Sequence, residues 1–303
     1  MAKITDWISA FRLRTLPLAL ASIGLGSFLA ASYGMFDGKI FFLSILTTLF
    51  LQILSNLSND YGDTINGADS SSRKGPARAV QSGRISPSAM RTAMYIASFL
   101  SLVSGISLLA VSGVLGKLDV FLFFLILGIA CIAAAIRYTS GKNPYGYVGF
   151  GDLAVFIFFG IVGVGGSFYL QVKSLPLDIF LPAAACGVFA TGVLNINNIR
   201  DIISDKEAGK YSIPVRLGDS NARIYHLVLL VSGIIFSTVY VSFHYQSPIQ
   251  FLFLSSVPFF IYNGLKVWKT KENFRLDPFL KQMALSTLLW MLTYGGGILL
   301  GKV

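Results

Sequence analysis

The amino-acid sequence predicts an all-α polytopic membrane protein, and composition and charge pattern are the observations that predict it. Of the 303 residues, 54% are apolar and only 13% are charged, whereas a soluble globular domain carries about 25% charged residues. Mean hydropathy is +0.69, and the aromatic fraction of 14% suits side chains that face lipid and its interfaces. Secreted disulfide scaffolds, soluble nucleotide enzymes and disordered tails are therefore excluded.

Charge-free apolar runs predict nine transmembrane helices, each of which needs roughly 20 residues. Seven runs lie at about 16–34, 40–57, 93–115, 120–136, 153–172, 179–199 and 283–300. An eighth stretch, 224–265, holds 42 residues and is twice as long as one crossing. The segment His244-Tyr245-Gln246-Ser247-Pro248 supplies a turn in its middle, so it predicts two helices. Residues 1–303 then form a single transmembrane domain.

The first run is interpreted as an uncleaved helix. Arg12 and Arg14 precede it, as in a signal peptide, but it reaches spanning length and no small-residue cleavage site ends it. Upstream of the run, Trp7, Ile8 and Phe11 share one helical face. This pattern predicts a short helix that lies in the plane of the membrane interface.

Lysine and arginine predict the orientation of the helices. Counted on alternate sides of nine crossings, 20 of the 24 lie on the side of the N-terminus and 4 on the other. The positive-inside rule then places the N-terminus in the cytoplasm and the C-terminus outside. The net charge of +10 reflects this topology and requires no nucleic-acid partner. Loops at 58–92, 137–152 and 200–223 are expected to face the cytoplasm and to carry function.

Two matched groups of acids and amides follow the second and sixth predicted helices. The first contains Asn56, Asn59, Asp60 and Asp63, and the second contains Asn197, Asn198, Asp201 and Asp205. Spacings of i, i+4 and i+7 or i+8 place the main members of each group on one face of a continued helix. The repetition four helices apart indicates an internal duplication. Polar residues at such depth are functional by default.

These oxygen-rich groups predict a magnesium diphosphate site formed by all eight residues. Both groups lie at helix C-termini, where the helix dipole disfavours acids, so a positive charge must offset them. Carboxylate and amide oxygens suit Mg²⁺, which leaves coordination positions for substrate phosphates. The cysteines and histidines, Cys131, Cys186, His226 and His244, show no spacing typical of metal ligands.

Basic residues near both groups are suited to neutralise the phosphate oxygens that Mg²⁺ leaves free. They are Arg73, Lys74, Arg78 and Arg84, then Lys142, then Lys206 and Lys210. Arg78, Lys142, Lys206 and Lys210 are the candidate diphosphate-binding residues. The glycine-rich segment 141–152 lacks a preceding strand and a Walker lysine, so it predicts a turn at the membrane surface rather than a nucleotide loop.

The paired motifs Asn56-x3-Asp60-x2-Asp63 and Asp201-x3-Asp205 resemble those of the UbiA superfamily of intramembrane prenyltransferases. The likeness extends over nearly the whole chain. The motifs closest to the superfamily branch that uses 1,4-dihydroxy-2-naphthoate are Arg14-Thr15-Leu16-Pro17, Asn59-Asp60-Tyr61-Gly62-Asp63, Gly75-Pro76-Ala77-Arg78-Ala79-Val80-Gln81-Ser82-Gly83, and Asn198-Ile199-Arg200-Asp201 with Asp205 and Ala208-Gly209-Lys210. Gly67 replaces an Asp common in the superfamily, and Asp69 is a candidate ligand two positions later.

The resemblance implies a UbiA-type helical bundle with a central lipid-open cavity, capped by cytoplasmic loops. It implies that Mg²⁺ on Asp60, Asp63, Asp201 and Asp205 holds a polyprenyl diphosphate, whose departing diphosphate leaves an allylic cation. An electron-rich carbon of 1,4-dihydroxy-2-naphthoate attacks the cation and loses CO₂, a step of menaquinone biosynthesis in a bacterial cytoplasmic membrane. Arg14 and Tyr138 are the candidate contacts for the aromatic acid, with Tyr61 and Tyr145 as further aromatic walls.

Two alternatives stay open. Within the same superfamily the acceptor could be 4-hydroxybenzoate, a haem precursor or a chlorophyll precursor, although the run at 75–83 favours dihydroxynaphthoate. A cation-coupled transporter is the alternative of another class. Such transporters are expected to have broken helices near the midplane, whereas the acids of this chain cluster at one membrane face.

Overall fold

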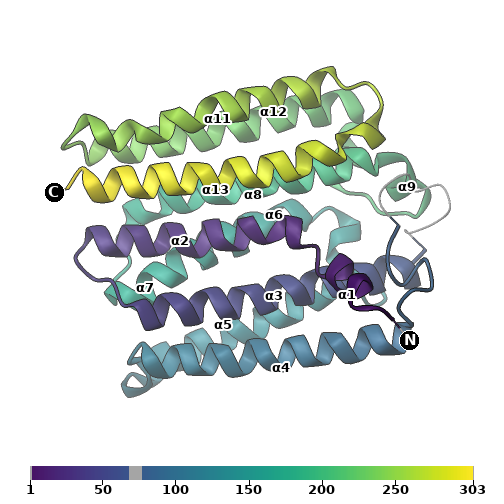
Figure 1. Ribbon diagram of the computed structural model, residues 1–303, viewed down its shortest axis with the longest axis horizontal. Coiled ribbons are helices and arrows are strands. Elements are labelled where there is room, and N and C mark those ends of the chain that lie inside the picture. Colours follow the sequence, from purple (N-terminus) through teal and green to yellow (C-terminus); the bar gives the residue numbers. More distant parts are fainter. Residues whose placement is uncertain (1, 68–76, 303) are drawn as a thin grey trace.

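The structure is a computed structural model that describes residues 2–67 and 77–302, where helices are the only regular secondary structure (Figure 1). Nine segments of the described residues are long and apolar enough to span a membrane: Ile4–Ser32, Gly38–Ile65, Pro87–Val111, Leu118–Arg137, Gly151–Val172, Leu177–Arg200, Asp219–Phe243, Pro248–Lys269 and Asn273–Leu300. The predicted all-α fold with nine spans is therefore confirmed. The chain ends lie at opposite ends of the bundle, as an odd number of crossings requires (Figure 1).

The helical elements lie in this order along the two halves of the sequence. The first half consists of α1 (Ile4–Phe11), η1 (Leu13–Thr15), α2 (Leu16–Ser32), α3 (Gly38–Ile65), α4 (Pro87–Val111), η2 (Val114–Gly116), α5 (Leu118–Arg137) and η3 (Tyr145–Val148). The second half consists of α6 (Gly151–Val155), η4 (Phe156–Gly165), α7 (Gly166–Val172), η5 (Leu177–Ile179), α8 (Phe180–Arg200), α9 (Ile202–Glu207), α10 (Ile213–Leu217), α11 (Asp219–Phe243), η6 (Pro248–Ser256), α12 (Val257–Lys269), η7 (Asn273–Leu276) and α13 (Asp277–Leu300).

The end of the bundle that carries α9, named the α9 end, gathers the polar connections of the chain (Figure 1). There α3, α5, α8 and α12 finish, and α4, α6, α11 and α13 begin. Short helix α1 also lies at this end, separated from α2 by Arg12, whose φ of 49° turns the chain. The described parts of the three loops that the charge count assigns to the cytoplasm thus share one end. That this end faces the cytoplasm stays a prediction.

Two helices extend into segment 58–92, which the sequence predicts as the first polar loop. α3 continues to Ile65, so the first acid group lies within the last turns of a helix. α4 begins at Pro87, because the Ser86 hydroxyl accepts the Ala89 N–H and proline is favoured in a first helical turn. The acids of α3 are therefore fixed on a rigid element rather than on a loop.

The bundle has its main core around α8. The largest cluster of buried side chains joins α2, α8, α11 and α13 and includes Phe189, Trp290 and Tyr294. A second cluster packs α1 and the 79–85 turn onto α3 and α4. By contrast, α5 has no fully buried residue. One face of α5 is therefore left for lipid, and another lines the cavity described below.

The fifth span differs from the continuous helix that its apolar run predicts. It consists of α6, a π-helical segment η4 and α7. At this point α2 approaches so closely that a Cβ at Gly163 would overlap Ser22 Oγ. The Ser22 hydroxyl donates to the Phe159 carbonyl at 2.5 Å. A π-helix pairs each carbonyl with the N–H five residues on instead of four, and the Phe159 carbonyl within this segment also accepts from Ser22.

Candidate active site

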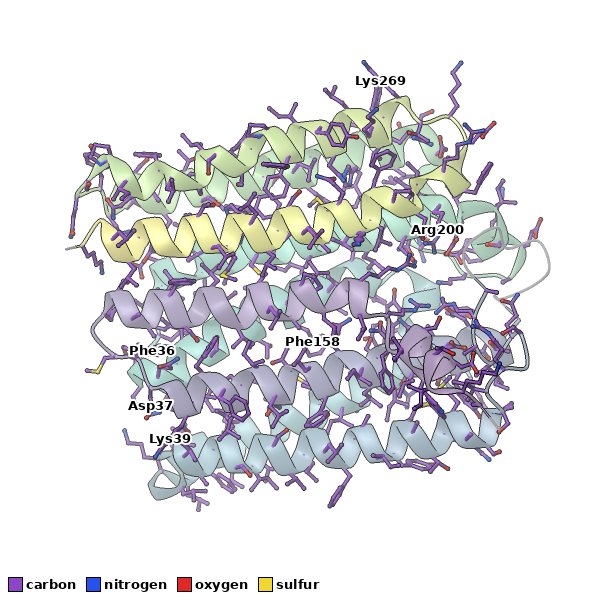
Figure 2. The ribbon with its side chains drawn as sticks, in the orientation of Figure 1. Phe36, Asp37, Lys39, Phe158, Arg200 and Lys269 are labelled. Carbon is purple, nitrogen blue, oxygen red and sulfur yellow. The ribbon has the colours of Figure 1, made fainter. Side chains whose placement is uncertain are left out.

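A cavity of about 330 Å³ runs from the α9 end into the bundle. Its polar end is lined by Asn56, Asn59, Asp63, Arg78, Tyr138, Asn197 and Lys210. Its remaining walls are mainly apolar and come from α2, α3, α4, α5, α8 and the fifth span. The lining reaches Ser44, 19 residues before Asp63 on α3, which corresponds to about 28 Å along a helix. Figure 2 shows Phe158, another lining residue, in the middle of the bundle.

The two acids at the end of α3 have different partners. Asp60 Oδ2 accepts the Ala79 N–H at 2.9 Å and Oδ1 accepts the Val80 N–H at 3.0 Å. This carboxylate therefore fastens the 78–81 turn onto α3. Asp63 faces side chains instead, because it accepts from Arg78 Nη2 at 2.9 Å and from Tyr147 Oη at 3.0 Å. The turn held by Asp60 thus places Arg78 against Asp63.

The acids after α8 are paired with bases. Arg200 donates to both oxygens of Asp201, at 2.8 and 2.6 Å, and to Asn197 Oδ1 at 2.8 Å. Asp205 Oδ1 lies 3.4 Å from Lys210 Nζ. The second group therefore combines carboxylates with two buried cationic side chains.

Lys210 joins the two acid groups. Its Nζ lies 3.4 Å from Asp205 Oδ1 and 4.0 Å from Asp63 Oδ1, so both carboxylates surround one ammonium. Burial by itself would lower the pKa of Lys210, but Asp205 and Asp63 outweigh it and raise that pKa above its usual value. Burial also raises the pKa of Asp205 to about 7, against the opposing effect of Lys210. Residues 142 positions apart on α3 and after α8 thus meet in one buried cluster.

Arg14 belongs to a chain of ion pairs at the α9 end. Its Nη1 donates to Asp277 Oδ2 at 2.7 Å, and Arg200 Nη1 donates to Asp277 Oδ1 at 2.5 Å. Arg14 itself does not line the cavity, although its neighbours Arg12 and Thr15 do. Figure 2 shows Arg200 close to α9.

Two tyrosines form an aromatic wall beside the acids. Tyr138 and Tyr145 both line the cavity, with ring centroids 5.4 Å apart in an edge-to-face arrangement. A Cβ at Gly146 would lie 2.6 Å from the Tyr138 carbonyl oxygen, so glycine is required where η3 crosses this residue. Burial raises the pKa of the Tyr138 hydroxyl further above its usual value, so this group is a neutral donor. Tyr61 does not line the cavity and packs among α1, α3 and α4.

The other candidate residues are distributed unevenly around the cavity. Asn56 donates to the Phe11 carbonyl and to Thr15, and Asn59 accepts from Thr139. Asn198 is buried but does not line the cavity. Lys142 and Lys206 are exposed and do not line it either. Asp69, Arg73 and Lys74 lie outside the described residues. As diphosphate contacts, Arg78 and Lys210 are therefore better placed than Lys142 and Lys206.

Three residues with clear contacts in the site were not selected from the sequence. Tyr147 donates to Asp63, Arg200 neutralises Asp201, and Asp277 joins Arg200 to Arg14. The position of Arg200 next to Asp201 inside the second motif was the one available signal. Tyr147 and Asp277 are distant in sequence from their partners, so no local pattern indicates them.

The donor set fits Mg²⁺, although its oxygens do not converge into a preformed cage. Among the described residues, no three His, Cys, Asp or Glu side chains could hold a metal ion by themselves. Asp205 Oδ2 and Asn198 Oδ1 are buried and accept no hydrogen bond from the described residues. Mg²⁺ is usually bound through one or two carboxylates, with substrate phosphates and water in its other positions. Oxygen ligands beside a cavity with basic residues meet that requirement.

Comparison with known proteins identifies similar sequences and structures. A profile of the UbiA prenyltransferase family matches residues 19–296. The 1,4-dihydroxy-2-naphthoate octaprenyltransferase of Escherichia coli (strain K12) is 43% identical over 302 residues, which cover 100% of this chain and 97% of that protein. The apo structure of a UbiA homolog from Aeropyrum pernix K1 has a TM-score of 0.67 at 18% identity, covering 97% of this chain and 99% of that one. A UbiA homolog from Archaeoglobus fulgidus bound to DMAPP and Mg²⁺ has a TM-score of 0.59 at 16% identity, covering 95% and 98%.

Proposed function

The chain belongs to the UbiA prenyltransferase family, and we propose that it prenylates 1,4-dihydroxy-2-naphthoate in menaquinone biosynthesis. The reaction transfers a polyprenyl group from polyprenyl diphosphate and releases CO₂ and diphosphate, giving demethylmenaquinol. The observation that carries this proposal is the 43% identity, over the whole chain, to an enzyme named for that acceptor. The cavity supports it, because an elongated cavity with mainly apolar walls and one charged end suits a polyprenyl diphosphate.

The diphosphate is proposed to bind at the α9 end, between the acid groups of α3 and of α8 and α9. Arg78 and Lys210 line this part of the cavity and offer cationic donors for phosphate oxygens. Bound Mg²⁺ would neutralise the charge that develops on the departing diphosphate. Its proposed ligands are Asp60, Asp63, Asp201 and Asp205, with the neighbouring asparagines. The Archaeoglobus homolog bound to DMAPP and Mg²⁺ supports a metal in this role.

In the proposed reaction the allylic carbon–oxygen bond breaks, and its electron pair leaves on the diphosphate. The ring carbon that carries the carboxylate uses its π electrons to form the new carbon–carbon bond. The carboxylate then departs as CO₂, and its bonding electrons restore the aromatic ring. Arg14 does not line the cavity but precedes the lining residue Thr15, and from there it is proposed to attract the acceptor carboxylate toward the cavity mouth. The faces of Tyr138 and Tyr145, which do line the cavity, are proposed to shelter positive charge.

The protein is proposed to lie in a bacterial cytoplasmic membrane with the α9 end facing the cytoplasm. The 20 to 4 asymmetry of basic residues supports this orientation. Substrates made in the cytosol would then reach the cavity directly.

The test is a prenyl-transfer assay on membranes that contain the protein, with the product identified by mass. Supplied with a prenyl diphosphate, Mg²⁺ and dihydroxynaphthoate, the protein should yield the acid plus one prenyl group minus CO₂. EDTA should abolish the reaction, and added Mg²⁺ should restore it. Prenylated 4-hydroxybenzoate that retains its carboxylate, without any naphthoate product, would assign the protein to another acceptor. Cation uptake without prenyl product would support transport instead.

A further inference from the structure

Asp277 occupies a junction between two arginines but does not line the cavity. It is the first residue of α13, where the helix dipole favours a carboxylate. Its two oxygens accept from Arg14 and from Arg200, at 2.7 and 2.5 Å. Any effect of Asp277 on the proposed diphosphate site must therefore pass through these arginines.

Arg200 divides its donors between two carboxylates. It binds both oxygens of Asp201 on one side and one oxygen of Asp277 on the other. Its side chain is only 1% exposed, against 28% for Asp277. Because the Arg200 guanidinium is buried, water cannot replace a partner that it loses. A buried charge without a partner is strongly destabilising, so Arg200 needs another acceptor.

A cation that binds Asp201 competes with Arg200 for the same negative charge. As Asp201 turns toward the cation, Arg200 loses part of its pairing and must be held by the groups that remain. Those groups are Asn197, which is neutral, and Asp277. Of these two, only Asp277 brings a full negative charge.

We propose that Asp277 retains Arg200 when Asp201 turns to Mg²⁺, and thereby sets the affinity of the site for the metal. Asp277 is then a positioning residue, which acts on Asp201 through Arg200. This inference rests on the proposed function, because it takes Asp201 as a ligand of the metal that accompanies the diphosphate. It goes further by assigning a role to a residue outside both acid groups.

Asp277→Asn should therefore weaken metal binding. In the variant, Arg200 stays on Asp201 and no carboxylate receives it, so the concentration of Mg²⁺ that gives half-maximal prenyl transfer should rise roughly tenfold, about the contribution of one hydrogen bond to a charged group. Mn²⁺ binding to the purified full chain in detergent, followed by electron paramagnetic resonance without substrates, should weaken by a similar factor. Asp277→Glu, which restores a carboxylate, should recover most of the affinity in both measurements.

Asp219→Asn is the matched control. Asp219 is also the first residue of a spanning helix, α11, and it pairs with a buried arginine, Arg223, at 2.8 Å. It has no contact with Asp201 among the described interactions. Both variants therefore lose one aspartate charge from an ion pair with a buried arginine. They differ because the arginine partner of Asp277, Arg200, also binds Asp201, whereas none of the described interactions joins Arg223 to Asp201.

The outcomes separate this inference from the proposed function. Equal Mn²⁺ affinity in Asp277→Asn and Asp219→Asn, or no recovery in Asp277→Glu, would overturn the role of Asp277 even if prenyl transfer proceeds. A wild-type protein that makes no prenylated naphthoate would instead overturn the proposed function. The Mn²⁺ titration would then still decide whether Asp277 controls a cation site, because it requires no turnover.

Discussion

Asp60→Asn should detach the 78–81 turn from the end of α3. Asp60 is 3% exposed, and each of its oxygens accepts one backbone N–H, from Ala79 and from Val80. Asparagine can accept only one of these bonds and would point its own NH₂ group at the second donor. One buried backbone N–H is then left without an acceptor.

The cost of this change follows from the two bonds. A hydrogen bond to a charged group contributes about 1.5–3 kcal/mol, and a buried unsatisfied donor costs about 1–3 kcal/mol. Together they destabilise the docked turn by about 2.5–6 kcal/mol. Since about 1.4 kcal/mol corresponds to a factor of ten, the equilibrium for opening the turn should shift by roughly a hundredfold or more. Arg78 would then lose its position beside Asp63.

Hydrogen–deuterium exchange measured by mass spectrometry is the appropriate assay. Peptides covering 77–85 should exchange much faster in Asp60→Asn than in the wild-type protein, while peptides from α8 and α13 should not change. Asp63→Asn is the matched control, because within residues 2–67 and 77–302 Asp63 accepts from the side chains of Arg78 and Tyr147 and its loss leaves the backbone bonds of the turn intact.

Unchanged exchange at 77–85 in Asp60→Asn would refute this reasoning. Asp60 would then not hold the turn, and any loss of prenyl transfer in this variant would point to a direct role in metal binding. Faster exchange in both variants would also contradict it, because the effect would follow from charge rather than from the backbone bonds.

Three further predictions follow from other contacts. Gly62→Ala should lower the melting temperature, because its Cβ would lie 2.5 Å from Thr139 Oγ1 and such overpacking costs about 1–3 kcal/mol; circular dichroism in detergent would measure it, and an unchanged melting temperature would contradict the close approach of α3 and Thr139. Mn²⁺ affinity should fall as the pH drops through about 7, since Asp205 with its raised pKa of about 7 becomes protonated and loses the charge that attracts a cation; titrations on either side of that pH would reveal it, and a pH-independent affinity would exclude Asp205 as a ligand. In a background without Cys131 and Cys186, a cysteine at Glu207 should react with a membrane-impermeant thiol reagent from the cytoplasmic side and one at Lys117 from the outside; the reverse pattern would invert the proposed topology.

The spans and the two acid groups could be predicted because their signals are local in the sequence. A run of about 20 apolar residues is sufficient for a membrane helix, and all nine predicted spans appear among the described residues. The spacing of Asn56, Asp60 and Asp63 presupposes a continued helix, and α3 does continue to Ile65. That both acid groups approach Lys210 follows from the tertiary fold, which brings the end of α3 and the segment after α8 to the same side chain; the motif repetition suggested this but could not place it.

The partners of the acids could not be predicted, because each one depends on distant segments that tertiary packing brings together. Tyr147 reaches Asp63 across 84 positions, and Asp277 reaches Arg200 across 77. Lys142 and Lys206 looked equivalent to Lys210 in sequence, yet Lys210 alone of the three lines the cavity. The π-helix was equally hidden, because it arises where Gly163 meets Ser22 from another helix.

The pairing of acids with bases would allow the proposed site to lie at the end of a membrane bundle and still bind charged ligands. Asp63 faces Arg78, Asp201 faces Arg200 and Asp205 faces Lys210, so the buried charges are compensated before any ligand arrives. A metal ion alone would draw the acids away from their bases and leave those bases uncompensated. A diphosphate alone would draw the bases away and leave the acids uncompensated. Together the two ligands exchange one set of ion pairs for another at little cost in net charge. Mn²⁺ and a prenyl diphosphate should therefore each increase the affinity of the site for the other by the same factor, as thermodynamic linkage requires. Titrations of each ligand with and without the other would measure this factor, and independent binding would show that the bases do not act as counter-ions for the diphosphate.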